Sequence, residues 1–325
     1  MARITIAGAG SIGCYVGGVL QDAGHDLRYL ARPRIIEAAA QSGLVLSDFD
    51  GAHRQIDAPD MRDDPGCLAS ADLIFVCVKS SATAEVADQI AAHARPEAVI
   101  VSLQNGVGNV DVLRAALPDH QVLAAMVPFN VVPKGPAAYH RATSGDILVQ
   151  DGPIPDLSTD DLIWRKVPNI EGIQWGKLLI NLGNATNALS DIPLLQQLND
   201  RGWRRLMADQ MSEALRVLKA AGIQPAKVAA PPKIVPHILR LPNVLFRRVA
   251  AQMLTVDAEA RSSMWDDLTQ RRTTEIDALQ GVIMTLGAKH GVPTPLIARL
   301  HALIKDAEQK AEGPPGLTVA DIRKA

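Results

Sequence analysis

A lysine and two amides stand at helical spacing in one short stretch of the second half of the chain. Lys177, Asn181 and Asn184 follow Trp175 and Gly176, separated from each other by four and three residues. In an α-helix this spacing puts the three side chains on one face. An ammonium group can donate a proton and the amides can hydrogen-bond an oxygen, so this face suits an anionic carbonyl substrate. Periodicity by itself favours the other interpretation, a solvated polar helix face.

A second group of polar residues lies nearer the C-terminus, in Ser262-Ser263-Met264-Trp265-Asp266-Asp267 and in Thr274-Glu275-Ile276-Asp277. Ser263, with Asp266 three residues later, is typical of a helix N-cap, which explains that serine structurally. Glu275 lies twelve residues beyond Ser263 and therefore off its helix face. The two side chains reach one pocket only if Ser263 lies at or before the helix start.

The start of the chain carries a glycine pattern between a predicted strand (3–7) and a predicted helix (14–23). The pattern is Gly8-Ala9-Gly10-Ser11-Ile12-Gly13. Gly8 permits a tight turn, Gly10 lets a pyrophosphate approach the backbone, and Gly13 lets the helix pack on the sheet. The helix start, at Ser11 and Ile12, offers N–H groups to the phosphates. The alternative is a turn that binds nothing, but the flanking elements favour a dinucleotide.

The end of the second predicted strand (27–31) indicates which dinucleotide binds. An Asp or Glu at this place would accept hydrogen bonds from a ribose 2′-hydroxyl, and none is present. Arg32 follows the strand, with Arg34 as a second candidate, and a guanidinium suits a 2′-phosphate. We therefore predict NADPH/NADP+ rather than NAD(H). The alternative is that both arginines are solvated surface residues.

The remaining pattern supplies the elements that must hold these residues. Continuous apolar runs at 71–78 and 98–103 flank a predicted helix at 82–94 and are typical of buried parallel strands. Gln104-Asn105-Gly106 follows the second run, at the sheet edge where ligands of such folds bind, although Asn-Gly is also a common turn. Two further strands are predicted at 122–132 and 145–149. Long helical patterns then begin, at 174–189, 194–221 and 256–290, with an irregular connection at 229–242 and a tail of no predicted order after Gly316.

This change from alternating strand and helix patterns to long helical patterns predicts two domains, 1–168 and 169–325. The first holds 13 Lys+Arg against 20 Asp+Glu and the second 20 against 15. A basic helical half suits an anionic substrate, although most such charges are ordinarily solvated surface.

Composition excludes several classes of protein. Of the 325 residues 47% are hydrophobic but only 3% aromatic, and the net charge is −2, which argues against nucleic-acid binding. The three cysteines show no C-x-x-C pairing, so neither a disulfide framework nor a structural zinc site is expected, and a reducing, cytoplasmic location follows. No apolar run is long enough for a membrane span. No G-x-S-x-G or H-E-x-x-H string occurs, so we predict neither a serine hydrolase nor a metal site.

Together these strings resemble the ketopantoate reductase (2-dehydropantoate 2-reductase) family over nearly the whole chain. The resemblance is carried by the motifs at 8–13, 77–79, 104–106, 175–181, 262–267 and 274–277. It implies an α/β Rossmann-type dinucleotide-binding domain followed by an all-α domain like that of 6-phosphogluconate dehydrogenases, with the site in the cleft between them.

The resemblance also implies a role for each residue. Lys177 is the general acid, and Glu275 orients the substrate hydroxyl and Lys177 and also lies near the cofactor. Ser263 helps to hold the substrate carboxylate, and Asn105 and Asn181 position the substrate near the nicotinamide. The remaining assignments are Lys79 and Arg32 on the cofactor side and a supporting role for Asp267.

One position departs from the family pattern. The family commonly has an asparagine eight residues after the lysine, but residue 185 is Ala, and either Asn184 or Asn187 replaces that amide. The predicted function is the NADPH-dependent reduction of 2-dehydropantoate to (R)-pantoate in pantothenate synthesis. The alternatives are reduction of another 2-oxo or 3-oxo acid and NADP(H) sensing without turnover. Beyond the small keto acid, the predicted partners include neither nucleic acid nor membrane, and a homodimer is left open.

Overall fold

The computed structural model describes residues 2–228, 230–254 and 259–324. The chain divides into two compact units, Met1–Ile170 and Glu171–Ala325. The division falls just beyond the predicted boundary at residue 168.

Unit 1 is built on an eight-stranded sheet with the order β12-β11-β8-β7-β6-β1-β2-β5. The adjacent strands β8, β7, β6, β1, β2 and β5 are parallel to one another. Strand β11 is antiparallel to β8, and β12 is parallel to β11. Their bounds are β1 Arg3–Ala7, β2 Asp26–Leu30, β5 Asp60–Arg62, β6 Leu73–Val76, β7 Val99–Ser102, β8 Gln121–Met126, β11 Ile147–Gln150 and β12 Trp164–Val167. Every residue of β6 and β7 is buried, as their continuous apolar sequences predict.

A second sheet in unit 1, with the order β4-β3-β10-β9, has no counterpart in the sequence prediction. Its strands are β3 Leu44–Asp48, β4 His53–Ile56, β9 Val131–Gly135 and β10 Ala138–Arg141. The strand predicted over 122–132 is therefore wrong, because it divides between β8 of the large sheet and β9 of the small one. Pro128 lies in the break, and Pro133 stands in an edge strand, where its missing N–H costs no ladder bond.

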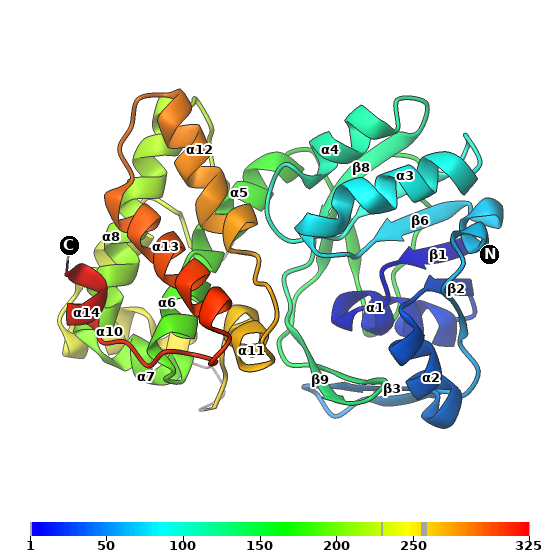
Figure 1. Cartoon of the computed structure of the whole chain (residues 1–325), viewed down its shortest axis with the longest axis horizontal. Helices are drawn as coiled ribbons and strands as arrows, with labels where there is room; N and C mark the ends of the chain where they lie inside the picture. The colour runs from blue at the N-terminus through cyan, green and yellow to red at the C-terminus, as the bar shows by residue number, and fades with distance from the viewer. Residues whose placement is uncertain (1, 229, 255–258, 325) are drawn as a thin grey trace. The chain divides into compact units, whose positions relative to one another are not determined.

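Helix α1 (Ser11–Asp22) contacts strands of both sheets of unit 1. A Cβ on Gly17 would come within 2.5 Å of the Tyr29 ring, and one on Gly18 within 2.5 Å of Leu46. Glycines on α1 thus allow it to pack closely on both sides. Figure 1 shows α3 (Thr83–His93) and α4 (Asn109–Ala116) on the face of the large sheet opposite α1. Helix α2 (Pro33–Ser42) follows β2.

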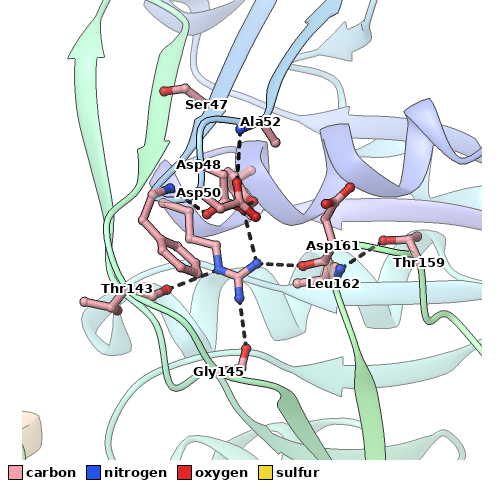
Figure 2. Close-up of polar contacts among 12 residues, drawn as sticks. Ser47, Asp48, Asp50, Ala52, Thr143, Gly145, Thr159, Asp161 and Leu162 are labelled. Atoms are coloured by element: carbon pink, nitrogen blue, oxygen red, sulfur yellow. Dashed lines mark hydrogen bonds and ion pairs between the residues drawn. The ribbon is translucent and has the colours of Figure 1, made fainter. Parts of the chain in front are cut away.

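A buried arginine links the small sheet to the loops after it. Arg141 is 6% exposed, and its Nη1 lies 3.3 Å from Asp48 Oδ2, which also accepts a 2.5 Å hydrogen bond from the Tyr15 hydroxyl on α1. The guanidinium also donates to three main-chain carbonyls, those of Thr143, Gly145 and Asp161 (Figure 2). A buried charge is tolerated when it is paired and hydrogen-bonded in this way. The cluster connects α1 to the small sheet.

In the described part of unit 2 every regular element is helical. The elements are α5 Ile170–Asn181, α6 Gly183–Ser190, α7 Leu194–Asn199, α8 Arg201–Ala220, α9 Val235–Arg240, α10 Asn243–Val249, the 3₁₀ turn Ala251–Leu254, α11 Ser263–Thr269, the π-helical turn Asp277–Gly281, α12 Val282–Lys289, α13 Pro295–Lys310 and α14 Val319–Arg323. Figure 1 shows α8 and α13 as long helices of this unit. Its buried arginine, Arg204, donates to the carbonyls of Leu198, Leu239 and Leu241 and to Asn243, and so joins α8 to its neighbours.

Four predictions for unit 2 are wrong. The helix predicted over 194–221 is interrupted at Asp200, whose extended backbone separates α7 from α8 and whose side chain caps α8. The helix predicted over 256–290 is broken after Thr269, where Arg271 adopts a φ of 54°; residues 255–258 lie outside the described residues. The irregular connection contains α9, because Pro236 stands in the first turn, where proline is tolerated. The tail folds as α14, since Thr318 and Asp321 form a capping box and Ile322 is buried.

Candidate active site

The glycine turn joins β1 to α1, and each glycine has a different surrounding. Gly8 has a φ of +105°, and a Cβ there would lie 2.8 Å from Val78 N; a Cβ on Gly13 would lie 2.5 Å from Gly8 O. Gly10 is exposed, and a Cβ would meet nothing within 4 Å. The N–H groups at the start of α1, on Ser11, Ile12 and Gly13, have no carbonyl partner within the helix. An open approach beside free helical N–H groups fits a dinucleotide pyrophosphate.

Arg32 lies just after β2, next to the glycine turn. The Gly8 and Ala9 N–H groups donate to the carbonyl of Leu30, the last residue of β2. Arg32 is the N-cap of α2, yet its side chain makes no capping bond and is exposed, as is that of Arg34. No carboxylate stands at the end of this strand. The position therefore offers a guanidinium where a ribose 2′-substituent would lie.

Lys79 and Asn105 follow the next two strands, β6 and β7, and both are exposed. Because β7, β6, β1 and β2 are adjacent and parallel, their carboxyl ends share one edge of the sheet. The structure thus brings the glycine turn, Arg32, Lys79 and Asn105 to the same edge. Ligands of doubly wound sheets bind at such an edge.

A buried polar network behind this edge was missed by the sequence reasoning. Gln104 Nε2 donates to the Val78 carbonyl at 3.1 Å and to Thr83 Oγ1 at 2.8 Å, and Gln104 Oε1 accepts from Ser102 at 3.0 Å. Asn109 Nδ2 donates to the Asn105 carbonyl at 2.9 Å. These bonds fix the loops that present Lys79 and Asn105. The sequence signal that could have indicated this network was Gln104 itself, a polar residue directly after an apolar strand.

In unit 2, Lys177 and Asn181 lie on α5 and Asn184 on α6, and all three are half-buried. Leu182 between the helices keeps helical backbone angles, and its N–H donates to the Leu178 carbonyl at 3.0 Å. The helical path therefore continues, and the three side chains share a face. Desolvation lowers the pKa of Lys177 below its ordinary value. An ammonium with a lowered pKa is a better proton donor than a solvated lysine.

Gly176 explains how the chain packs beside Lys177. A Cβ on Gly176 would lie 2.3 Å from the Ala226 carbonyl oxygen, and the Ala226 N–H donates to Gly172 O at 2.7 Å. The segment around Ala226 thus crosses α5 in close contact one residue from the lysine. Only glycine allows this approach.

Asn187 is fully buried and serves the fold. Its Nδ2 donates to the Ile192 carbonyl at 2.9 Å and to Gln197 Oε1 at 3.2 Å, and its Oδ1 accepts from Ser262 N at 2.8 Å. With these bonds made, Asn187 has no place on the polar face. Of the two asparagines left open by the sequence, only Asn184 lies on the face with Lys177.

The N-cap of α11 is Ser262, so the prediction of Ser263 as the cap is wrong by one residue. Ser262 Oγ accepts from Trp265 N at 3.2 Å and donates to the Asn184 carbonyl at 3.2 Å. Ser263 is the first helical residue and is exposed. Ser263 and Glu275 can reach one site only if Ser263 lies at or before the helix start, and the structure meets this condition. Asp267 is buried and lies 3.5 Å from Arg272 Nε.

Glu275 is half-buried and lies two residues before the start of the π-helical turn Asp277–Gly281. From that turn, Gln280 Nε2 donates to the Leu182 carbonyl at 2.9 Å. This bond and those of Ser262 connect the segments of Glu275 and Ser263 to the α5–α6 junction. Gln280 was also missed by the sequence reasoning.

The cysteines are not candidate nucleophiles. Burial raises the pKa of Cys14 to about 12, and it also raises the pKa values of Cys67 and Cys77. A thiol is nucleophilic as the thiolate, which these values suppress at neutral pH. Within the described residues no helix is long and apolar enough to span a membrane.

Comparison with known proteins identifies a family for both units. The family model described as ketopantoate reductase PanE/ApbA matches residues 4–153, and the model of its C-terminal part matches residues 169–308. A 2-dehydropantoate 2-reductase of Halobacterium salinarum is 28% identical, with 94% of this chain and 99% of the relative covered.

Two solved structures are also similar. A PanE/ApbA family ketopantoate reductase of Ralstonia eutropha JMP134 has a TM-score of 0.80 and 29% identity, with 95% of this chain and 99% of the other covered. D-Mandelate dehydrogenase with NADH and anilino(oxo)acetate has a TM-score of 0.78 at 20% identity, over 95% and 99% of the two chains, a likeness of fold alone. The predicted fold class, an α/β dinucleotide-binding domain followed by a helical domain, is confirmed, as is the prediction of an oxidoreductase. The chain belongs to the ketopantoate reductase family.

Proposed function

We propose that this protein reduces a 2-oxo acid with NADPH and that 2-dehydropantoate is its substrate, giving (R)-pantoate for pantothenate synthesis. The observation that carries the proposal is Lys177, a desolvated ammonium on one helix face with Asn181 and Asn184. Family membership and the names of the relatives support the same substrate.

The chemistry divides between a hydride donor and a proton donor. A nicotinamide dinucleotide, when bound, supplies the hydride that the keto carbon needs. The glycine turn and the N–H groups of Ser11 and Ile12 hold the pyrophosphate, and Arg32 pairs with the 2′-phosphate. Lys79, Asn105 and Glu275 complete the cofactor side.

The unit 2 residues act on the substrate. The Lys177 ammonium stabilises the negative charge that develops on the keto oxygen and transfers a proton to it, so that the hydroxyl forms. Asn181 and Asn184 donate hydrogen bonds to the substrate, Asn105 helps to position it, and Ser263 helps to hold the carboxylate. Glu275 orients the hydroxyl and Lys177. The proposal therefore takes most of the cofactor-binding groups from unit 1 and the proton donor from unit 2.

A second substrate is favoured by one observation. Position 185 is a buried Ala, and Asn187 is occupied in the core, so the second family amide is replaced only by Asn184, one residue earlier. The substrate-binding side therefore differs from the pattern of the family. A different 2-oxo acid, or a 3-oxo acid, is the alternative within the same chemistry.

The test is an assay of purified protein at 340 nm with NADPH or NADH and a panel of 2-oxo and 3-oxo acids that includes ketopantoate. We expect the fastest loss of absorbance with NADPH and ketopantoate. Faster turnover of another acid would replace the substrate but retain the reaction. If calorimetry shows tight NADPH binding while no acid is reduced, the protein is a sensor and the proposal is wrong. Light scattering of the same sample decides between a monomer and the homodimer that the sequence left open.

A further inference from the structure

The segment that carries Glu275 is anchored to α13 on both sides. Before it, Thr274 donates to Glu308 Oε1 through its N–H at 2.8 Å and through its hydroxyl at 2.7 Å. After it, Asp277 lies 2.6 Å from His301 Nε2 and 3.1 Å from Lys305 Nζ. Two anchors from one helix therefore bracket Glu275.

The two anchors differ in burial. Thr274 is 7% exposed and the Glu308 side chain 12%, whereas the Asp277 side chain is 65% exposed. Ion pairs in water contribute little because solvent screens them and the side chains lose entropy. Hydrogen bonds to a buried carboxylate are stronger and costly to break. The Thr274–Glu308 contact is therefore the anchor that matters more.

The Thr274 hydroxyl also fixes the main chain around Glu275. While it donates to Glu308, its oxygen accepts from Ile276 N at 3.2 Å, so it spans the residue between. The Glu275 carbonyl in turn accepts from Ala278 N at 3.0 Å and Leu279 N at 3.1 Å. The backbone of Glu275 lies in an irregular segment, but hydrogen bonds hold it on both sides.

We propose that Thr274 and Glu308 are positioning residues that fix the carboxylate of Glu275 for the reaction. This inference rests on the proposed function, since Glu275 acts there on the substrate and on Lys177. Loss of the anchor lets the backbone at residue 275 shift while the carboxylate itself remains. A misplacement of about 1 Å can cost up to about 100-fold in rate.

The kinetic test compares variants that break or keep the anchor. Thr274→Val removes the hydroxyl at nearly constant shape, and Glu308→Ala removes the acceptor; each lowers kcat about tenfold or more. Thr274→Ser and Glu308→Gln can keep the hydrogen bonds between positions 274 and 308, although Glu308→Gln gives up the ion pair with Lys305 Nζ at 3.0 Å, and both recover most of that loss. Asp306→Ala is the matched control, because Asp306 lies on the same helix, is exposed, and bonds to Lys310. It leaves kcat unchanged.

A double-mutant cycle separates positioning from a general structural role. In a Glu275→Gln background, Thr274→Val and Glu308→Ala cost no further kcat, because their effect passes through the Glu275 carboxylate. A loss as large in that background as in the wild type overturns the inference. It does so without touching the proposed function, since the wild type remains active.

A second readout needs no activity. Hydrogen exchange of the 274–278 backbone amides becomes about tenfold faster in Thr274→Val and Glu308→Ala, but not in Thr274→Ser, Glu308→Gln or the Asp306 control. If the wild type reduces no oxo acid, the proposed function fails, and this exchange alone decides on the anchor. Unchanged exchange in both disruptive variants overturns it.

Discussion

The two units build their candidate site residues in different ways. In unit 1 the glycine turn lies within six consecutive residues, and the groups that we propose bind the cofactor are backbone N–H groups at the start of α1. In unit 2 the polar side chains stand on separate segments, joined by buried hydrogen bonds such as Gln280 to Leu182 and Ser262 to Asn187. A site built from backbone N–H groups is disturbed when a substitution adds a Cβ atom nearby. A site built from side chains is disturbed when a substitution removes a residue that holds them in place, even one far away in the sequence. Substitutions in unit 1 should therefore change cofactor affinity or folding, and those in unit 2 the rate.

The largest effect is expected for Lys177→Ala. Loss of the proton donor lowers kcat by about 10²- to 10⁴-fold. The NADPH dissociation constant stays within about twofold, because the backbone N–H groups that we propose bind the phosphates are unchanged. Steady-state kinetics and a fluorescence titration measure the two quantities. A normal kcat would show that Lys177 is not the proton donor. A loss of NADPH affinity as large as the loss of kcat would contradict the proposed difference between the two units.

A matched glycine pair tests the backbone-made site. Gly13→Ala places a Cβ 2.5 Å from Gly8 O, whereas Gly10→Ala meets nothing within 4 Å. We expect Gly13→Ala to lower the free energy of unfolding by about 1–3 kcal/mol, as overpacking typically does. Gly10→Ala leaves stability nearly unchanged but weakens NADPH binding, because its methyl group occupies the approach of the phosphate. Urea unfolding and calorimetry give both values, and equal stabilities of the two variants would contradict the packing argument.

Arg32→Ala separates the two nicotinamide cofactors. Removing a charged hydrogen bond of about 1.5–3 kcal/mol weakens NADPH binding about 10- to 100-fold. NADH has no 2′-phosphate, so its affinity stays the same. Arg34→Ala serves as the control, with a smaller effect. Equal losses for NADPH and NADH would show that Arg32 does not read the 2′-position.

The smallest effect distinguishes two adjacent serines. Ser262→Ala removes the N-cap of α11 and should cost about 1 kcal/mol of stability. Ser263→Ala, at an exposed first helical residue, should cost less than about 0.5 kcal/mol. Thermal unfolding of the two variants side by side measures the difference. A larger loss of stability in Ser263→Ala than in Ser262→Ala would indicate that Ser263 is the N-cap.

Local sequence was enough for features that depend on consecutive residues. The strand before Gly8, the helix after Gly10 and the buried runs of β6 and β7 follow from period and composition within short windows. The same holds for the polar face of Lys177, Asn181 and Asn184, because helical spacing sets it.

Features that depend on partners far along the chain were not predictable. Strand β3 pairs with β10, and the ion pair of Asp48 with Arg141 joins the same two strands. Neither β3 nor β10 has a long apolar run, so each becomes a strand only through this pairing. In unit 2, the structural role of Asn187 is shown by its burial and by its bonds to Ile192, Gln197 and Ser262, the last of which lies 75 residues away along the chain. The break after Thr269 similarly depends on the left-handed conformation of Arg271.

The central claim is that Lys177 donates the proton, and the pH dependence of kcat/KM, which reports the ionisations of the free enzyme, tests it most directly. An acid must be protonated to act, so activity is present below the pKa of Lys177 and is lost as pH rises through it. Desolvation lowers that pKa from 10.5, which puts the basic limb of the wild-type profile below pH 10.5. We predict that this limb is present in the wild type and absent from the residual activity of Lys177→Ala. The same basic limb in both proteins would contradict the account.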